Sequence, residues 1–141
     1  MTIHYHNRRE LPASEAGDAK YVTFDELISQ SDVISLNLAL NPQTHHIIST
    51  REFEKMKDEV VIVNTARGPI IDENALVAAL KSGKVYSAGL DVFENEPEIH
   101  PELLTSDKVV LLPHIGTATF ESRVSLVHIR IPCRSLADVY L

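Results

Sequence analysis

The chain has 141 residues, 13 of them basic and 20 acidic, which gives a formal net charge of −7. An acidic chain without a long basic run is not expected to bind nucleic acid or an anionic membrane surface. The single cysteine, Cys133, cannot form an intrachain disulfide, and no apolar stretch approaches the length of a membrane span. We therefore expect a cytoplasmic protein with one hydrophobic core and no metal site.

The first part of the chain shows two short strand patterns followed by a helix. Apolar and polar residues alternate over residues 1–6, and a polar loop separates them from a second strand candidate at residues 21–23. Thr23 and Glu26 have the spacing of a capping box, which predicts that a helix begins there.

Two Val/Ile-rich stretches, residues 33–38 and residues 60–63, predict the central strands. An apolar run that leads into a helix is typical of a parallel strand buried on both faces. Between the two stretches, residues 41–44 predict a turn, and Ser49 or Thr50 is expected to cap a helix.

The remaining elements continue this alternation. Asp72 is expected to cap a helix that ends at Gly83. Further strands are predicted over residues 86–93 and 109–112, and a last helix over residues 120–127. The chain therefore predicts an α/β fold with a mainly parallel sheet and flanking helices.

Three strand ends each carry a polar group that suits the chemistry of a 2-oxo acid: Arg67, Glu96 and His114. Parallel strands bring their carboxyl ends to one edge of a sheet, so these groups are expected to meet. Arginine holds a carboxylate with two parallel hydrogen bonds, and histidine exchanges protons near neutral pH. A neighbouring glutamate favours the protonated imidazole and fixes its orientation.

Each of these residues also has a simpler interpretation. Arg67 could be a surface arginine in a loop, and His114 a structural histidine after a proline. Glu96 could be one of several solvated acids, because spacing alone does not choose among the four that lie close together. The other three are Glu94, Glu98 and Glu102.

Three motifs follow one another along the chain: NTARG (64–68), GLDVFENEP (89–97) and PHIG (113–116). They strongly resemble the D-isomer-specific 2-hydroxyacid dehydrogenases, and within that family the glyoxylate/hydroxypyruvate reductases. The resemblance covers about residues 1–123. It implies an NAD(P)-dependent oxidoreductase that reduces a small 2-oxo acid, with this part of the chain forming a partial, Rossmann-like cofactor domain.

The resemblance also implies a role for each residue of the site. Arg67 would hold the substrate carboxylate, and His114 would give the carbonyl oxygen its proton. The family's glutamate precedes the proline, which selects Glu96 as the partner of His114. The remaining matches are cofactor positions, with Asp91 at the nicotinamide carboxamide. The cofactor set is Asn7, Arg8, Arg9, Leu38, Ala39, Thr65, Ala66, Arg67, Asp91, His114 and Gly116.

Cofactor choice depends on the residues that follow the first strand. A Rossmann cofactor's ribose is read at the end of the second strand of the fold, where an acid favours NAD and an arginine accommodates NADP. Asn7, Arg8 and Arg9 occupy that position by the resemblance, so NADPH is expected, with NAD as the alternative. Arg8 and Arg9 could equally be a solvated pair.

The chain departs from the family in ways that carry expectations of their own. Its five glycines form no GxGxxG motif, and no substrate domain is expected in it. Residues 124–141 are expected to form a divergent tail. We expect weak cofactor binding and little or no turnover by the chain alone. Complete family members are commonly homodimers, so a homodimer is a further expectation.

By the resemblance, the family's cofactor domain opens with a further strand and the GxGxxG turn before the equivalent of Met1, and that strand is the central one in the strand order 3-2-1-4-5-6. We therefore expect residues 33–116 to form the folded nucleus, and residues 1–22 either to pair directly against residues 33–38 or to be poorly ordered.

A second class of function also suits the sequence, a non-catalytic dinucleotide-binding or corepressor-like module, because fold alone does not fix activity. The presence of Arg67, Glu96 and His114 together favours the oxidoreductase.

Overall fold

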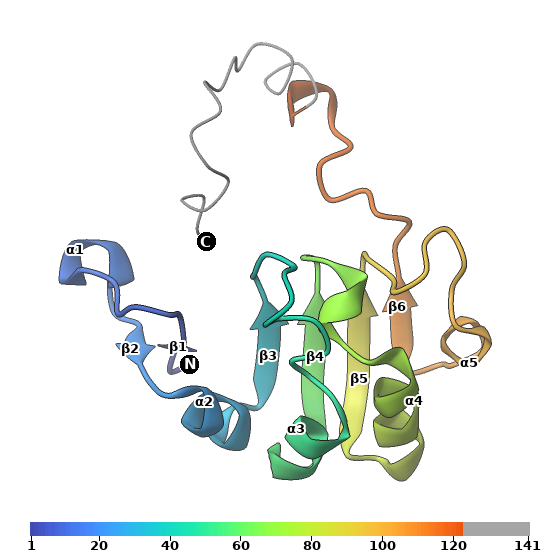
Figure 1. Cartoon of the computed structure of the whole chain (residues 1–141), viewed down its shortest axis with the longest axis horizontal. Helices are drawn as coiled ribbons and strands as arrows, with labels where there is room; N and C mark the ends of the chain where they lie inside the picture. Colours follow the sequence, from blue (N-terminus) through green and yellow to red (C-terminus); the bar gives the residue numbers. More distant parts are fainter. Residues whose placement is uncertain (123–141) are drawn as a thin grey trace.

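The computed structural model describes residues 1–122, which form two parallel sheets with flanking helices (Figure 1). The larger sheet has the order β3-β4-β5-β6, and the smaller consists of β1 and β2. The predicted α/β class is therefore confirmed. The strands are β1 (His4–Tyr5), β2 (Lys20–Tyr21), β3 (Val33–Leu36), β4 (Val60–Asn64), β5 (Val85–Leu90) and β6 (Val109–Leu111).

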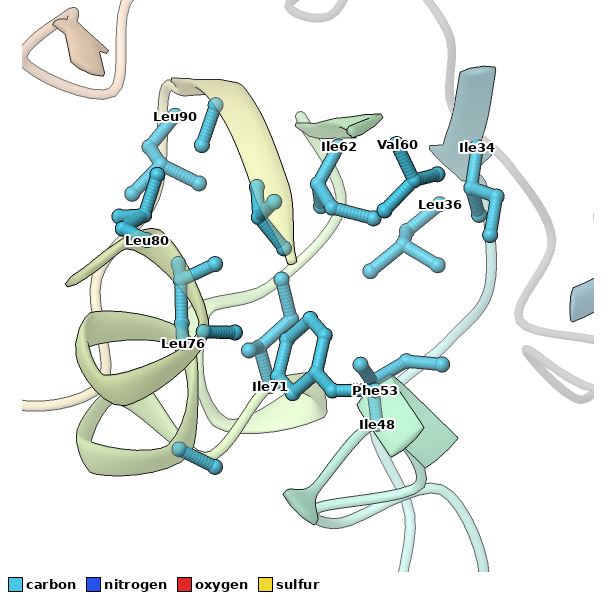
Figure 2. Close-up of a cluster of buried hydrophobic side chains, with 14 of the residues drawn as sticks. Ile34, Leu36, Ile48, Phe53, Val60, Ile62, Ile71, Leu76, Leu80 and Leu90 are labelled. Atoms are coloured by element: carbon cyan, nitrogen blue, oxygen red, sulfur yellow. The ribbon is translucent and has the colours of Figure 1, made fainter. Parts of the chain in front are cut away.

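The core lies between the larger sheet and the helices α3 (Thr50–Lys55) and α4 (Glu73–Ser82), as Figure 2 shows. Ile34 and Leu36 of β3 are buried there, together with Val60 and Ile62 of β4. Leu76 and Leu80 of α4 and Phe53 of α3 face them from the helices. The side chains that alternate with these strand residues belong to the opposite face.

That opposite face contradicts the expectation that the central strands are buried on both faces. Val33 is 59% exposed, Tyr86 of β5 is 63% exposed and Val110 of β6 is 66% exposed. The prediction was wrong because, among the described residues, α3 and α4 pack on one face of the sheet and leave the other open (Figure 1). A valine run predicts a strand, but it does not report how many faces are covered.

Three helix starts agree with the predicted caps. Asp72 caps α4 by accepting a hydrogen bond from Ala75 N–H at 3.1 Å, and Gly83, at φ +81°, ends it in the left-handed region. Ser49 is the N-cap of α3. Thr23 and Glu26 form the expected capping box at the start of α2 (Phe24–Gln30).

Three short elements were not predicted, because none is long enough to show a helical period of apolar residues. They are α1 (Ala13–Ala16), the 3₁₀ turn η1 (Gly68–Ile70) and α5 (Pro101–Leu104). The last predicted helix begins at Phe120, and the part beyond Ser122 lies outside the described residues. None of the helices within residues 1–122 combines the length and the apolar character needed to cross a bilayer.

The N-terminal segment forms its own sheet. His4 pairs with Lys20 and Tyr5 with Tyr21 in a parallel ladder, so the first of the two alternatives for residues 1–22, direct pairing against residues 33–38, is wrong. The ring centroids of Tyr5 and Tyr21 lie 5.4 Å apart, and the Tyr5 hydroxyl accepts a hydrogen bond from Leu11 N–H at 2.9 Å. Local aromatic contacts and two residue pairs therefore organise this small unit.

Candidate active site at the carboxyl ends of the strands

The turn after β4 presents Arg67, and a buried amide shapes this turn. Asn64 is the last residue of β4; its Nδ2 donates to Arg67 C=O at 3.0 Å, and its Oδ1 accepts from Ala66 N–H at 3.1 Å. Arg67 itself is exposed, with Nη1 donating to Ala66 C=O at 2.6 Å. Reasoning from the sequence assigned Asn64 no role, although an asparagine side chain often stabilises a turn by hydrogen-bonding the backbone two residues further on.

Gly68 brings this turn into direct contact with the loop that follows β5. A Cβ atom on Gly68 would lie 1.9 Å from the carbonyl carbon of Phe93 and 2.0 Å from its oxygen. No side chain fits there without backbone displacement. The turn that carries Arg67 and the loop that carries Glu96 therefore pack backbone to backbone.

Glu96 lies against His114. Its Oε2 is 2.9 Å from His114 Nδ1, and its Oε1 accepts a hydrogen bond from Phe93 N–H at 3.0 Å. The hydrogen bond with His114 and then that from Phe93 lower the pKa of Glu96, and the charge of Arg67 lowers the pKa of Glu96 further. The Glu96 carboxylate is therefore held in its anionic form within the electrostatic reach of both Arg67 and His114.

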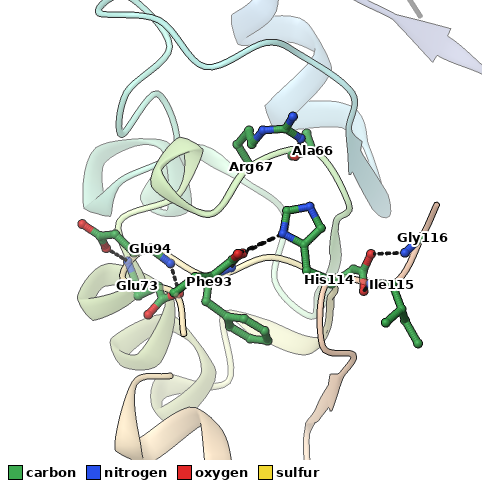
Figure 3. Close-up of polar contacts among 10 residues, drawn as sticks. Ala66, Arg67, Glu73, Phe93, Glu94, His114, Ile115 and Gly116 are labelled. Atoms are coloured by element: carbon green, nitrogen blue, oxygen red, sulfur yellow. Dashed lines mark hydrogen bonds and ion pairs between the residues drawn. The ribbon is translucent and has the colours of Figure 1, made fainter. Parts of the chain in front are cut away.

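His114 follows β6 on a short loop that the Asp91 side chain holds by two hydrogen bonds. The buried Asp91 carboxylate accepts hydrogen bonds from Ile115 N–H at 2.9 Å and Gly116 N–H at 2.8 Å (Figure 3). His114 has a φ of +53°, a left-handed conformation that an L-residue adopts only when its surroundings impose it. The two bonds to Asp91 supply that constraint.

This geometry determines which nitrogen of His114 is available for chemistry. An ionised carboxylate only accepts hydrogen bonds, so the nitrogen that faces Glu96, Nδ1, must carry a hydrogen. Nε2 is then the position from which a proton can be given or taken. Arg67 has guanidinium donors beyond the one that binds Ala66, and these can receive a carboxylate.

The structure separates the four acids that sequence spacing left open. Only Glu96 of the four contacts His114. Glu94 instead places Oε1 2.8 Å from His46 Nε2, and Glu102 forms an ion pair with Lys81. Within residues 1–122, no group of three or more His, Cys, Asp or Glu side chains is arranged to hold a metal ion.

The other sequence candidates lie in two further places. Leu38 and Ala39 follow β3, and Thr65 and Ala66 lie in the turn after β4, beside Arg67. Asn7, Arg8 and Arg9 follow β1 in the smaller sheet, which shares no strand pairing with the larger one. Asn7 Oδ1 accepts a hydrogen bond from Arg8 N–H at 2.8 Å, and both arginines are exposed.

The fold and the site together define a class of protein. A parallel α/β sheet with polar groups gathered at the carboxyl ends of its strands is a Rossmann-like, ligand-binding domain. The sequence model of the family "D-isomer specific 2-hydroxyacid dehydrogenase, NAD binding domain" matches residues 1–116. The chain belongs to this family.

Similar proteins agree with this assignment. The chain is 64% identical over 123 residues to 4-methyl-2-oxopentanoate reductase A of Aspergillus oryzae, covering 87% of this chain and 37% of that protein. It is 56% identical over 119 residues to glyoxylate reductase 1 of Saccharomyces cerevisiae, covering 84% of this chain and 34% of that one. The chain thus spans little more than a third of the length of these relatives.

A solved structure of a glyoxylate reductase from Paecilomyes thermophila superimposes with a TM-score of 0.88 at 61% identity, covering 90% of this chain and 39% of that one. D-mandelate dehydrogenase of Rhodotorula graminis, in a holo form, gives a TM-score of 0.84 at 42% identity, covering 86% of this chain and 36% of that one. The described fold is therefore that of the family's NAD-binding domain.

Proposed function

We propose that this chain provides the dinucleotide site and the proton-transfer pair for NADPH-dependent reduction of a small 2-oxo acid, glyoxylate or hydroxypyruvate. The observation that carries the proposal is the contact between Glu96 and His114 Nδ1 at 2.9 Å, within electrostatic reach of Arg67. A carboxylate anchor, a proton donor and an orienting acid are the three groups that this reduction requires.

The residues divide the chemistry as follows. Arg67 binds the substrate carboxylate and orients the adjacent carbonyl toward His114. His114 gives a proton from Nε2 to the carbonyl oxygen, and takes it back in the direction of oxidation. Glu96 holds the ring through Nδ1 and favours the protonated imidazole. When bound, a nicotinamide dinucleotide supplies the hydride.

The residues present fit such a cofactor at its two ends. The exposed guanidinium groups of Arg8 and Arg9 suit the 2′-phosphate of NADPH. Each oxygen of Asp91 accepts one backbone hydrogen bond, which leaves acceptor capacity for a carboxamide. Leu38, Ala39, Thr65, Ala66 and Gly116 would line the path between these ends.

Substrate class follows from what the similar proteins have in common. Their names specify 4-methyl-2-oxopentanoate, glyoxylate and D-mandelate, which differ in side chain but share a carboxylate beside a carbonyl or hydroxyl carbon. Arg67 and His114 would contact only the carboxylate and the adjacent carbonyl or hydroxyl group that these acids share. Selection of the side chain is therefore left to residues outside this trio.

The first experiment is binding of NADPH and NADH to the 141-residue chain, followed by fluorescence. Arg8→Gln is expected to weaken NADPH binding about tenfold, equivalent to one charge-assisted hydrogen bond, and to leave NADH unchanged. Arg51→Gln on α3 is the matched control. Equal loss of both dinucleotides, or no loss, would overturn the 2′-phosphate assignment.

The second experiment tests the substrate site in the presence of NADPH. Adding glyoxylate should perturb the Arg67 and His114 side-chain NMR signals, and Arg67→Gln should abolish that response in a chain kept saturated with NADPH. NADPH consumption with glyoxylate and hydroxypyruvate measures turnover. A chain that binds the dinucleotide but shows no response to either acid would instead be a binding module.

We also propose that the chain forms a homodimer. The family resemblance implies a homodimer, and the open sheet face with Val33, Tyr86 and Val110 gives an apolar surface that association could cover. Sedimentation of the intact chain measures this directly.

A further inference from the structure

Two side chains outside the proposed proton-transfer pair, His46 and Glu94, make a close contact that the reaction does not use. His46 Nε2 lies 2.8 Å from Glu94 Oε1, and both side chains are largely shielded from solvent, at 31% and 22% exposure. The two residues are 48 positions apart in the sequence. The contact therefore joins two loops that α3, β4, α4 and β5 separate along the chain.

Glu94 is also joined to the start of α4 by a reciprocal pair of hydrogen bonds. Its N–H donates to Glu73 Oε1 at 2.8 Å, and its Oε2 accepts from Glu73 N–H at 3.3 Å (Figure 3). Glu73 is the first residue of α4, where a carboxylate also meets the positive end of the helix. The loop after β5 is thus fixed to a rigid element on one side.

The backbone of His46 is hydrogen-bonded to the turn that carries Arg67. Its N–H donates to the carbonyl of Pro69, two residues after Arg67, at 2.9 Å. Its φ of +51° places it in the left-handed region, which costs free energy unless the surroundings hold it. His46 therefore reaches from the Arg67 turn to the Glu96 loop and touches both.

We propose that Glu94, held by His46 and Glu73, is a positioning residue that keeps Glu96 within hydrogen-bonding distance of His114. Glu94 precedes Glu96 by two residues, and the Phe93 N–H, immediately before Glu94, donates a hydrogen bond to the Glu96 carboxylate. The proposal rests on the proposed function only for the role of His114; the positioning itself concerns Glu96 and can be measured without substrate or cofactor.

The pKa of Glu96 reports on this arrangement. The contact with His114 is the largest cause that holds the pKa of Glu96 below the ordinary 4.5 of a glutamate. If the loop loosens, that contact lengthens and the pKa of Glu96 rises toward 4.5. Removal of a nearby negative charge, by itself, would lower the pKa of Glu96 instead. Positioning and simple electrostatics therefore predict opposite directions.

The experiment follows the Glu96 side-chain carboxyl by ¹³C NMR during an acid titration of the full chain. Glu94→Ala is expected to raise the Glu96 midpoint by about half a pH unit, because the hydrogen bond is only partly lost. Glu98→Ala is the matched control, since it removes a charge from the same loop. That control is expected to leave the midpoint in place or to lower it.

A midpoint that is unchanged or lowered in a folded Glu94→Ala chain overturns the proposal and leaves Glu94 with a purely structural role. Should that variant not fold, His46→Asn replaces it, because asparagine tolerates the left-handed backbone but is too short to reach Glu94. The same upward shift is expected there, and its absence overturns the proposal. Failure of dinucleotide binding would contradict the proposed function without moving the Glu96 midpoint.

Discussion

The two ends of the expected cofactor site are built in different ways. At the carboxyl ends of β4, β5 and β6, the buried Asp91 side chain binds the loop that follows β6, and Gly68 allows the turn after β4 to pack directly on the backbone of Phe93. The residues proposed to bind the cofactor ribose follow β1, which pairs with one strand of equal length, two residues. The end proposed for catalysis is thus held by tertiary contacts, whereas the other end depends on local ones.

The largest effect is expected where the turn that carries Arg67 touches the loop that carries Glu96. Gly68→Ala places a methyl group 1.9 Å from the Phe93 carbonyl carbon, so the backbone must move. We expect a loss of about 3 kcal/mol in the free energy of unfolding, measured by denaturant titration. Gly89→Ala on β5 is the control, since nothing lies within 4 Å of a Cβ there. Equal losses in both variants would contradict the close packing.

The next effect concerns the loop that carries His114. Asp91→Ala removes the acceptor for Ile115 and Gly116 N–H groups and should cost about 2 kcal/mol of unfolding free energy. Asp91→Asn keeps one acceptor oxygen and should lose less. Faster amide exchange at Ile115 and Gly116 is the local measurement, and protection unchanged from wild type would refute the role.

A smaller effect, of opposite sign, is expected at Glu73. Burial raises the pKa of Glu73 above 4.5, so the folded chain retains this proton to a higher pH than the unfolded chain. Stability from this group is therefore present below pH 4.5 and is lost as the pH rises through the folded pKa. Glu73→Gln keeps the acceptor for Glu94 N–H and should be more stable than wild type at pH 7, by about 1 kcal/mol.

That advantage should shrink as the pH falls below 4.5, because Glu73 is then neutral in both states. Denaturant titrations of both chains at pH 4 and pH 7 measure it. An advantage that does not change with pH would show that burial of the charge is not its cause.

The smallest free energies of opening are expected in the sheet of β1 and β2. The Lys20 and Val22 N–H groups donate to the carbonyls of Ile3 and Tyr5, and few buried contacts support them. Native-state hydrogen exchange should release these amides before that of Ile62 in β4. Equal protection of Val22 and Ile62 would remove the contrast between the two ends of the site.

The sequence was most informative where chemistry is local. Caps at Thr23 and Asp72, the strand cores and the order of the three motifs could all be read from spacing. Relations between loops could not: nothing in the sequence shows that Gly68 meets Phe93 or that His46 reaches Glu94. The choice of Glu96 among the four acids needed the family motif, because spacing within one loop does not define which side chain points toward His114.

The burial of the strands was misjudged for a related physical reason. Valine at both odd and even positions of residues 60–63 indicates apolar surroundings but not their source. In the described chain Val61 and Val63 are half-buried while Val60 and Ile62 are buried. The apolar residues of a strand show that it suits an apolar environment. How far the strand is buried depends on which helices or loops pack on each face of the sheet.

The open face of the larger sheet has a thermodynamic consequence. In the monomer, the exposed side chains of Val33, Tyr86 and Val110 are already hydrated before unfolding, so unfolding transfers less new apolar surface to water than the number of residues implies. The heat-capacity change of unfolding should therefore fall below the usual ~12–15 cal/mol/K per residue. A flatter stability curve follows, in which the folded state gains less from the hydrophobic effect and varies less in stability between cold and warm conditions.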